Sequence, residues 1–154
     1  MGFFDGYNVA TSGMSAQRTR INVVSANIAN AKTTHTAEGG PYKKQEVVFE
    51  DVLVANTNKR TNANDVETTN SPLSESSLRG VGVRKIIQSD AKPVLKYDPT
   101  HPDANEKGHV AYPDINPVIE MVNLIEAMRS YEANVTSFNT HRGIDSKTLE
   151  ILNS

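Results

Sequence analysis

The 154-residue sequence contains no cysteine and no tryptophan. Without cysteine, the chain forms no disulfide, binds no metal through thiolates and holds no cysteine nucleophile. Hydrophobic residues make up 37% of the chain and aromatic residues 6%, which is lean for a globular enzyme of this length. We therefore expect a small buried core.

A strong net charge and long apolar runs are also missing. The net charge is −2 and the pI is near 6.1, so the charge does not indicate nucleic acid or an anionic membrane as a partner. No stretch approaches the roughly 18 consecutive apolar residues of a membrane span. The first residues lack the basic and uninterrupted apolar segments of a signal peptide. We therefore expect a protein that is cytosolic, or that is exported without a cleaved signal peptide.

What the chain does contain is an apolar stripe in its first 31 residues, called here the N-terminal stripe. Its members recur at alternating spacings of three and four, the heptad spacing along which two helices pack. They are Tyr7, Ala10, Met14, Gln17, Ile21, Val24, Ile28 and Ala31. A surface helix normally carries Lys and Glu on its other side, but only Arg18 and Arg20 are charged between Gly6 and Ala31. We therefore predict a helix that has neighbours on several sides.

A second stripe of the same period, the C-terminal stripe, follows Asn116 and Pro117, which suit the cap and first position of a helix. It consists of Met121, Leu124, Met128, Tyr131, Val135 and Phe138. We expect this helix to continue through Gly143, although glycine costs about 1 kcal/mol relative to alanine there. Because the two stripes match in period, they are predicted to pack antiparallel.

Between the stripes, short β-branched runs alternate with turn residues, which predicts three to five strands. The runs lie at 47–49, 81–87, 94–97 and 110–112. The sequence thus predicts an α+β fold in which long terminal helices form an antiparallel coiled coil beside a small β-rich middle. The expected divisions are an N-terminal helix in 1–35, a β-rich region in 36–115 with a flexible Asn/Thr/Ser-rich loop in 55–79, and a C-terminal helix in 116–154.

Catalytic and metal-binding patterns are weak in this sequence. The run Asp103–Gly108 followed by Asp114 overlays a calcium-loop template, but Lys107 occupies a ligand position. The histidines lack the paired helical spacing of a metal site, and no serine lies in a Gly-x-Ser-x-Gly turn. We therefore predict no enzyme activity, no cofactor, no metal and no small-molecule substrate.

Three short motifs occur in an order that is specific when taken together. They are Ser25-Ala-Asn-Ile-Ala-Asn30, Gly39-Gly-Pro-Tyr42 and Tyr131-Glu-Ala-Asn-Val135. In this order they resemble the bacterial flagellar rod and hook family. The segments 16–24, 97–104 and 110–113 are similar to its proximal rod subgroup in particular, whereas Lys32 departs from the extended signature. The resemblance covers nearly the whole chain.

The resemblance implies a structural subunit that is exported by the flagellar type III apparatus and polymerises helically with copies of itself and other rod proteins. Such a rod crosses the periplasm and transmits torque from motor to hook. The two stripes would then serve in helix packing and in subunit interfaces. The alternative is a soluble coiled-coil adaptor or secreted binding protein that holds one partner through the same stripe.

Two asparagines and two arginines of the first helix allow two interpretations each. Asn27 and Asn30 either cap backbone groups at the helix end or, as the family signature suggests, bridge neighbouring subunits through their amides. We favour the bridging role. Arg18 and Arg20 are either inter-subunit donors or solvated charges, and the sequence does not decide between these.

Overall fold

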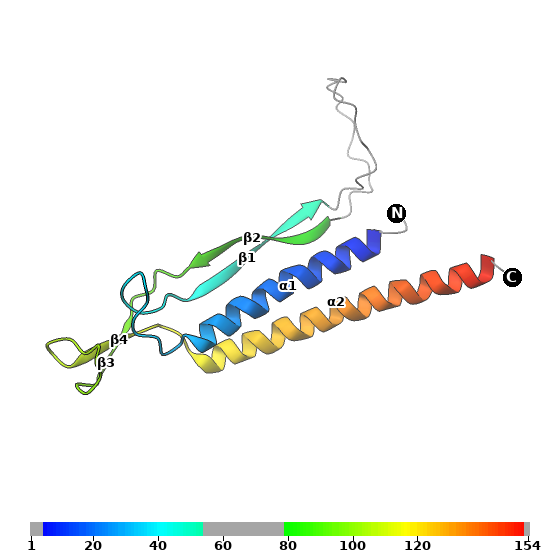
Figure 1. Ribbon diagram of the computed structural model, residues 1–154. Coiled ribbons are helices and arrows are strands. Elements are labelled where there is room, and N and C mark those ends of the chain that lie inside the picture. The colour runs from blue at the N-terminus through cyan, green and yellow to red at the C-terminus, as the bar shows by residue number, and fades with distance from the viewer. Residues whose placement is uncertain (1–4, 54–78, 153–154) are drawn as a thin grey trace, which may run out of the picture.

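The computed structural model describes residues 5–53 and 79–152. In chain order, the elements are α1 (Asp5–Ala29), β1 (Gln45–Leu53), β2 (Arg79–Gln88), β3 (Val94–Tyr97), β4 (His109–Tyr112) and α2 (Pro117–Leu152). The two helices lie side by side, the β1–β2 hairpin runs along α1, and the β3–β4 hairpin lies at the end away from the termini (Figure 1). The predicted α+β fold is confirmed.

The two helices pack antiparallel, as their matching periods predicted. Tyr7 near the start of α1 contacts Phe138, whereas Asn27 near its end contacts Glu120 in the first turn of α2. The Oδ1 of Asn116 accepts a hydrogen bond from the N–H of Val118 at 3.0 Å, so it caps α2 as expected. The helix also continues through Gly143 without a break.

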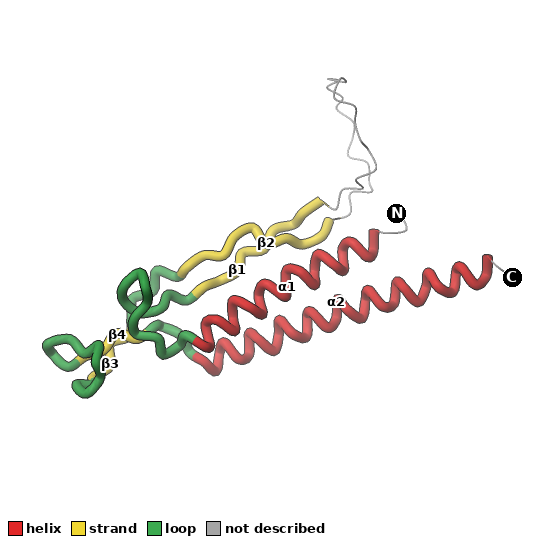
Figure 2. The backbone as a smooth tube through the Cα atoms, in the orientation of Figure 1, coloured by secondary structure: helices red, strands yellow, loops and turns green. Residues whose placement is uncertain are grey.

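The strands form two separate antiparallel hairpins rather than a single sheet (Figure 2). In the first, Gln45 pairs with Gln88 at one end and Leu53 with Arg79 at the other, with a bulge between Val48 and Phe49. The second hairpin, β3–β4, pairs four residues with four. A two-stranded ribbon is marginal alone, so the first hairpin depends on the helix against which it packs.

The β1–β2 hairpin covers one side of α1. The hydroxyl of Ser12 on α1 accepts a hydrogen bond from the backbone N–H of Val81 on β2 at 3.2 Å, and the small side chain of Ala16 beside it is buried. Part of the uncharged back of α1 is therefore covered within the chain. One of the neighbours predicted for this helix is therefore the hairpin of its own chain and not another subunit.

The core of the described residues is small, as the composition predicted. Its buried hydrophobic residues are Ala10, Ala16, Val23, Val24, Val110 and Ala127. In the described part of the chain, neither helix has the length and apolarity that crossing a membrane requires. The loop predicted in 55–79 lies, except for Arg79, outside the described residues.

Candidate functional site

Helix α1 has three faces with different surroundings. One face meets α2 along the predicted seam, and a second meets the β1–β2 hairpin. The third is exposed, and we call it the outer face of α1. It consists of Asn8, Thr11, Ser15, Arg18, Asn22, Ser25 and Ala29. These positions recur at spacings of three and four, so they form one continuous strip, and Arg18 is its one charged member.

The predicted N-terminal stripe lies against α2 in the structure. Its members Ala10 and Val24 are buried, as is the neighbouring Asn27. The other members of the stripe are half-buried, as is Asn30: Tyr7, Met14, Gln17, Ile21, Ile28 and Ala31. Gln17 is the polar member of the stripe, and its buried Oε1 has no hydrogen-bond partner among the described residues.

The contact face of α2 differs from the predicted stripe at alternate positions. Leu124, Tyr131, Val135 and Phe138 are half-buried, but Met121 and Met128 are 51% and 46% exposed. Their places in the seam are taken by Glu120 and Ala127, which are buried. The apolar pattern favoured the two methionines because the residues that enter the seam are polar or small. The predicted part of Met121 and Met128 in a subunit interface stays a prediction.

The seam is closely packed in the first half of α1. A Cβ added to Gly13 would lie 2.7 Å from the side-chain Oδ1 of Asn134, and one added to Gly6 would lie 2.8 Å from the ring of His141. Glycine at these positions therefore lets polar side chains of α2 reach the backbone of α1. Between the two glycines in the sequence, Tyr7 packs edge-on against Phe138 with ring centroids 4.9 Å apart.

Tyr7 also fixes the start of α1 against the C-terminal half of α2. Its hydroxyl donates a hydrogen bond to the Oδ2 of Asp145 at 2.5 Å. This hydrogen bond is the main cause that raises the pKa of Tyr7 above its ordinary value of 10.0, because losing the phenol proton would place two negative charges side by side.

At the other end of the seam, Asn27 uses every hydrogen-bonding position of its amide within its own chain. Its Nδ2 donates to the backbone oxygen of Gln45 at 2.8 Å and to Glu120 Oε2 at 3.1 Å. Its Oδ1 accepts from the backbone N–H of Gln45 at 2.9 Å and from the hydroxyl of Tyr42 at 3.1 Å. Asn27 is 1% exposed. It therefore has neither the access nor the free donors to bridge subunits, which corrects that prediction.

Asn30 makes hydrogen bonds at the end of α1. Its Nδ2 donates to the backbone oxygen of Ala26 at 2.9 Å, and its Oδ1 accepts from the hydroxyl of Thr33 at 3.1 Å. These are the local contacts of a helix-terminal asparagine. A role for Asn30 between subunits stays a prediction.

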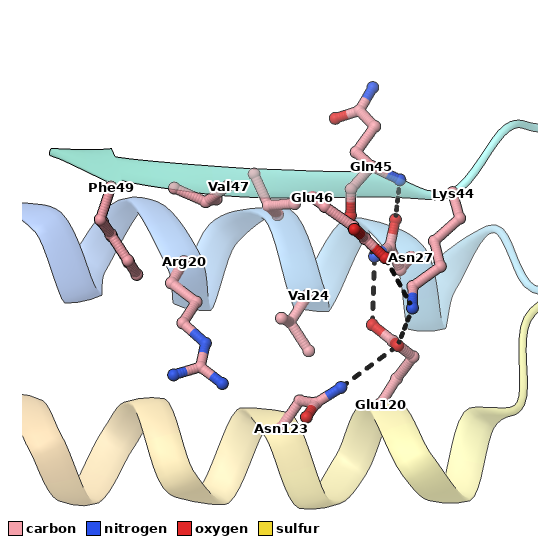
Figure 3. A pocket seen from close by; sticks show the side chains of 11 residues that line it. Arg20, Val24, Asn27, Lys44, Gln45, Glu46, Val47, Phe49, Glu120 and Asn123 are labelled. Carbon is pink, nitrogen blue, oxygen red and sulfur yellow. Dashed lines mark hydrogen bonds and ion pairs between the residues drawn. The ribbon is translucent and has the colours of Figure 1, made fainter. Parts of the chain in front are cut away.

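The carboxylate of Glu120 links α2 to the segment before β1 (Figure 3). Besides Asn27, it binds Lys44 Nζ at 3.2 Å and accepts from Asn123 Nδ2 at 3.3 Å. Glu120 is 2% exposed, so it is a buried charge that is both paired and hydrogen-bonded. It lies in the first turn of α2, where the helix dipole favours a negative charge. We call Asn27, Tyr42, Lys44, Gln45 and Glu120 the polar cluster.

Two members of the polar cluster have raised pKa values. Burial alone would lower the pKa of Lys44, but hydrogen bonds to the carboxylates of Glu46 and Glu120 outweigh it and raise the pKa above 10.5. Burial raises the pKa of Tyr42 above 10.0, and the negative charge of Glu120 adds to this. At neutral pH the cluster therefore holds a charged lysine beside a neutral tyrosine.

The polar cluster closes one end of an open hollow of about 250 Å³ between β1 and α2, with α1 as its floor. Val24, Val47 and Phe49 also line it, and Arg20 reaches across it toward Glu126 at 3.4 Å. Arg20 thus pairs within its own chain, whereas Arg18 is exposed on the outer face of α1. In the described part of the chain, no group of three His, Cys, Asp or Glu side chains could hold a metal. The polar cluster joins the end of α1, the segment at the start of β1 and the first turn of α2.

Four members of this cluster were not predicted as site residues. Tyr42, Lys44, Gln45 and Glu120 have no regular spacing from Asn27, and Tyr42 stood out only as the last residue of the Gly39–Tyr42 motif. One feature of the sequence could have indicated the cluster, namely that Glu120 lies on the side of α2 that packs against α1. Recognising this requires knowing which side of α2 meets α1, and apolar periodicity alone selected a different set of residues.

Both helices match models of known protein families. Residues 8–34 match the flagella basal body rod protein family, and residues 106–151 match the C-terminal part of the flagellar basal body rod FlgEFG proteins. The chain is 41% identical to the flagellar basal-body rod protein FlgC of Borreliella burgdorferi over 99% of both chains. The chain belongs to the FlgC family. The FlgC protein of Bacillus subtilis is 39% identical over 96% of this chain and 97% of its own, and that of Escherichia coli O6:H1 is 35% identical over 98% of both.

The two matched segments of this FlgC-family chain are the ones that pack together. The first contains most of α1 and the turn after it, and the second contains β4 and nearly all of α2. Most of the seam, together with Asn27 and Glu120, therefore lies in the segments that identify the family.

Proposed function

We propose that this FlgC-family chain is a structural subunit of the flagellar basal-body rod that assembles with copies of itself and with other rod proteins. The observation that supports this role best is the state of the two terminal helices. Each contacts the other along one side, and each leaves a further side exposed that is poor in charge. A helix with such a side gains stability when a neighbour covers it.

We further propose that the chain reaches the rod through the flagellar type III export apparatus without a cleaved signal peptide, and that the rod lies in the periplasmic space and transmits torque. The small core supports this route, because a chain that buries few large side chains unfolds at low cost. Assembly would then supply the burial that a single chain lacks. The role is structural rather than catalytic.

A deletion of the gene in its own bacterium tests the rod function. We expect a non-motile strain whose basal bodies lack a complete rod, and we expect the wild-type gene supplied on a plasmid to restore swimming. The chain should also be found in basal bodies purified from the restored strain. Complete rods in the deleted strain, together with recovery of the chain from the restored strain in a soluble complex with one other protein, would favour the adaptor alternative.

A further inference from the structure

Helix α2 exposes an apolar strip that lies outside its contact with α1. Met121, Ile125 and Met128 lie on this strip and are 51%, 51% and 46% exposed. Glu132, which is also exposed, continues it at the same spacing. Val118 and Val122 flank it and are exposed as well. We call Val118, Met121, Val122, Ile125, Met128 and Glu132 the outer face of α2.

The outer face of α1 has complementary properties. Along it, Ala29, Ser25, Asn22 and Arg18 are exposed and follow one another at spacings of four, three and four toward the N-terminus. Along α2, Met121, Ile125, Met128 and Glu132 follow at the same spacings toward the C-terminus. Two antiparallel helices with equal spacings can stay in contact over several turns.

In one register every pair along these two strips is complementary. Met121 faces Ala29, Ile125 faces Ser25 and Met128 faces Asn22. The next pair is Glu132 with Arg18, which have opposite charge. Large side chains therefore meet small or short ones, as side chains of one helix enter the spaces between those of another, and the charges at the end of the strip specify the register.

We propose that the outer face of α2 docks on the outer face of α1 of a second copy of this chain, with Arg18 and Glu132 paired across the contact. This inference rests on the proposed rod function and names the faces that meet. The contact joins two different faces, so it is heterologous when a copy uses its two faces on two different neighbours, and a copy that has used its α2 face then still offers its α1 face. Repetition therefore adds copies in one direction. A pairing of two α2 faces would leave the α1 face uncovered.

Charge reversal tests the contact with the full-length chain. Self-association is measured by sedimentation velocity over a range of protein concentrations. We expect R18E and E132R each to weaken association about fivefold or more, and the double variant to restore it, since a lost exposed ion pair and a new like-charge contact both act at this position. The matched control is R84E, which makes the same charge change at an exposed position on β2. Two results would overturn the proposal. One is that the wild-type chain stays monomeric, and the other is that it associates but R18E and R84E affect association equally.

A crosslink provides a readout independent of stability. Because the chain has no cysteine, a chain carrying S25C mixed with a chain carrying I125C can form a disulfide only between those two positions or between identical positions. We expect the mixed S25C–I125C dimer to dominate under mild oxidation. The control mixture of S25C with L95C, exposed on β3, should give little mixed dimer. Equal yields in the two mixtures contradict the proposal.

The same I125C chain separates this proposal from the proposed function. In purified basal bodies, a crosslink of I125C to S25C of another copy supports both. A photocrosslinker attached to the thiol of the I125C chain reaches proteins without cysteine, and a crosslink formed only to a different rod protein overturns the second copy as occupant but leaves the rod function intact. A chain that is absent from basal bodies contradicts the rod function whatever its behaviour in solution.

Discussion

Asn27 shows how one residue can join three segments of this protein. Its side chain bridges the end of α1, the first residue of β1 and the first turn of α2. Because the rest of the seam is rich in small side chains, apolar packing alone would tolerate a shift along the helices. A buried amide with four hydrogen bonds to three residues does not tolerate a shift, so we assign Asn27 the role of specifying the register.

Replacing Asn27 by alanine is therefore expected to lower the free energy of unfolding by about 2–4 kcal/mol. The backbone N–H and C=O of Gln45 and the carboxylate of Glu120 would lose buried hydrogen bonds, and unsatisfied buried groups are costly. Urea unfolding followed by circular dichroism measures the change. Asn22 on the outer face of α1 is the matched control, and N22A should change stability by no more than about 0.5 kcal/mol. Equal effects of the two variants would show that the amide does not hold the register.

The raised pKa values of Lys44 and Tyr42 predict loss of stability at alkaline pH. For both groups the folded pKa lies above the ordinary value, so the folded state binds the proton more tightly than the unfolded state. Their contribution is complete below the ordinary values of 10.5 and 10.0, and it is lost as the pH rises through the folded values.

The measurement is the urea midpoint of wild type and of the K44M/Y42F double variant, compared between about pH 9 and about pH 11. The midpoint of wild type should fall more steeply, because the variant lacks both groups. Other lysines titrate in the same range, so the difference between the two slopes is the informative quantity. If the urea midpoints of wild type and variant fall equally with pH, the titration of Lys44 and Tyr42 does not affect stability.

At the scale of elements, the α1–α2 seam depends on close approach rather than on large apolar side chains. Ala10 and Ala127 are buried in it, and Gly13 lies against Asn134. Small residues allow backbones to approach, but each of them buries little apolar area. The seam therefore gains much of its specificity from shape and hydrogen bonds.

A double-mutant cycle at Gly13 and Asn134 tests this packing. G13A alone should destabilise the protein by about 1 kcal/mol or more, even though alanine is the better helix former, because the new methyl group overlaps the Asn134 side chain. In the N134A background the methyl group has space, so the same change should become neutral or stabilising. Thermal unfolding of the four proteins gives the coupling. A stabilising effect of G13A in both backgrounds would show that the helices are further apart.

At the scale of the whole molecule, the chain has more helix than its core supports. The two helices have 25 and 36 residues, whereas the described residues bury only a few aliphatic side chains. Helices in proteins obtain most of their stability from tertiary packing. The outer faces therefore remain a source of stability that only other subunits can supply.

Circular dichroism of the isolated chain tests this view. In dilute solution we expect less helix than the 25 and 36 residues of the folded structure, and we expect the signal to increase with protein concentration as copies associate. Arg18→Glu should shift this increase to higher concentration, whereas Arg84→Glu should not. Full helicity at the lowest concentrations would show that the helices fold without association, and it would contradict the view that folding depends on assembly.

The local elements of this protein could be predicted because their signals are local. Heptad spacing indicated both helices, the Asn116–Pro117 pair indicated the start of α2, and β-branched runs indicated all four strands of the described residues. The contact phase of α2 could not be predicted in the same way. Apolar periodicity selects Met121 and Met128, but the rotation of α2 about its axis buries Glu120 and Ala127 and leaves the two methionines exposed.

The sequence by itself determined the terminal helices, their antiparallel pairing and the resemblance to the rod family, because these depend on residue spacing and on contiguous motifs. Only the tertiary structure decided that a hairpin covers one side of α1, that Asn27 is saturated within its chain, and that the exposed sides of α1 and α2 are complementary. These features depend on groups that lie far apart in the sequence and meet only when packing sets the rotation of each helix about its axis.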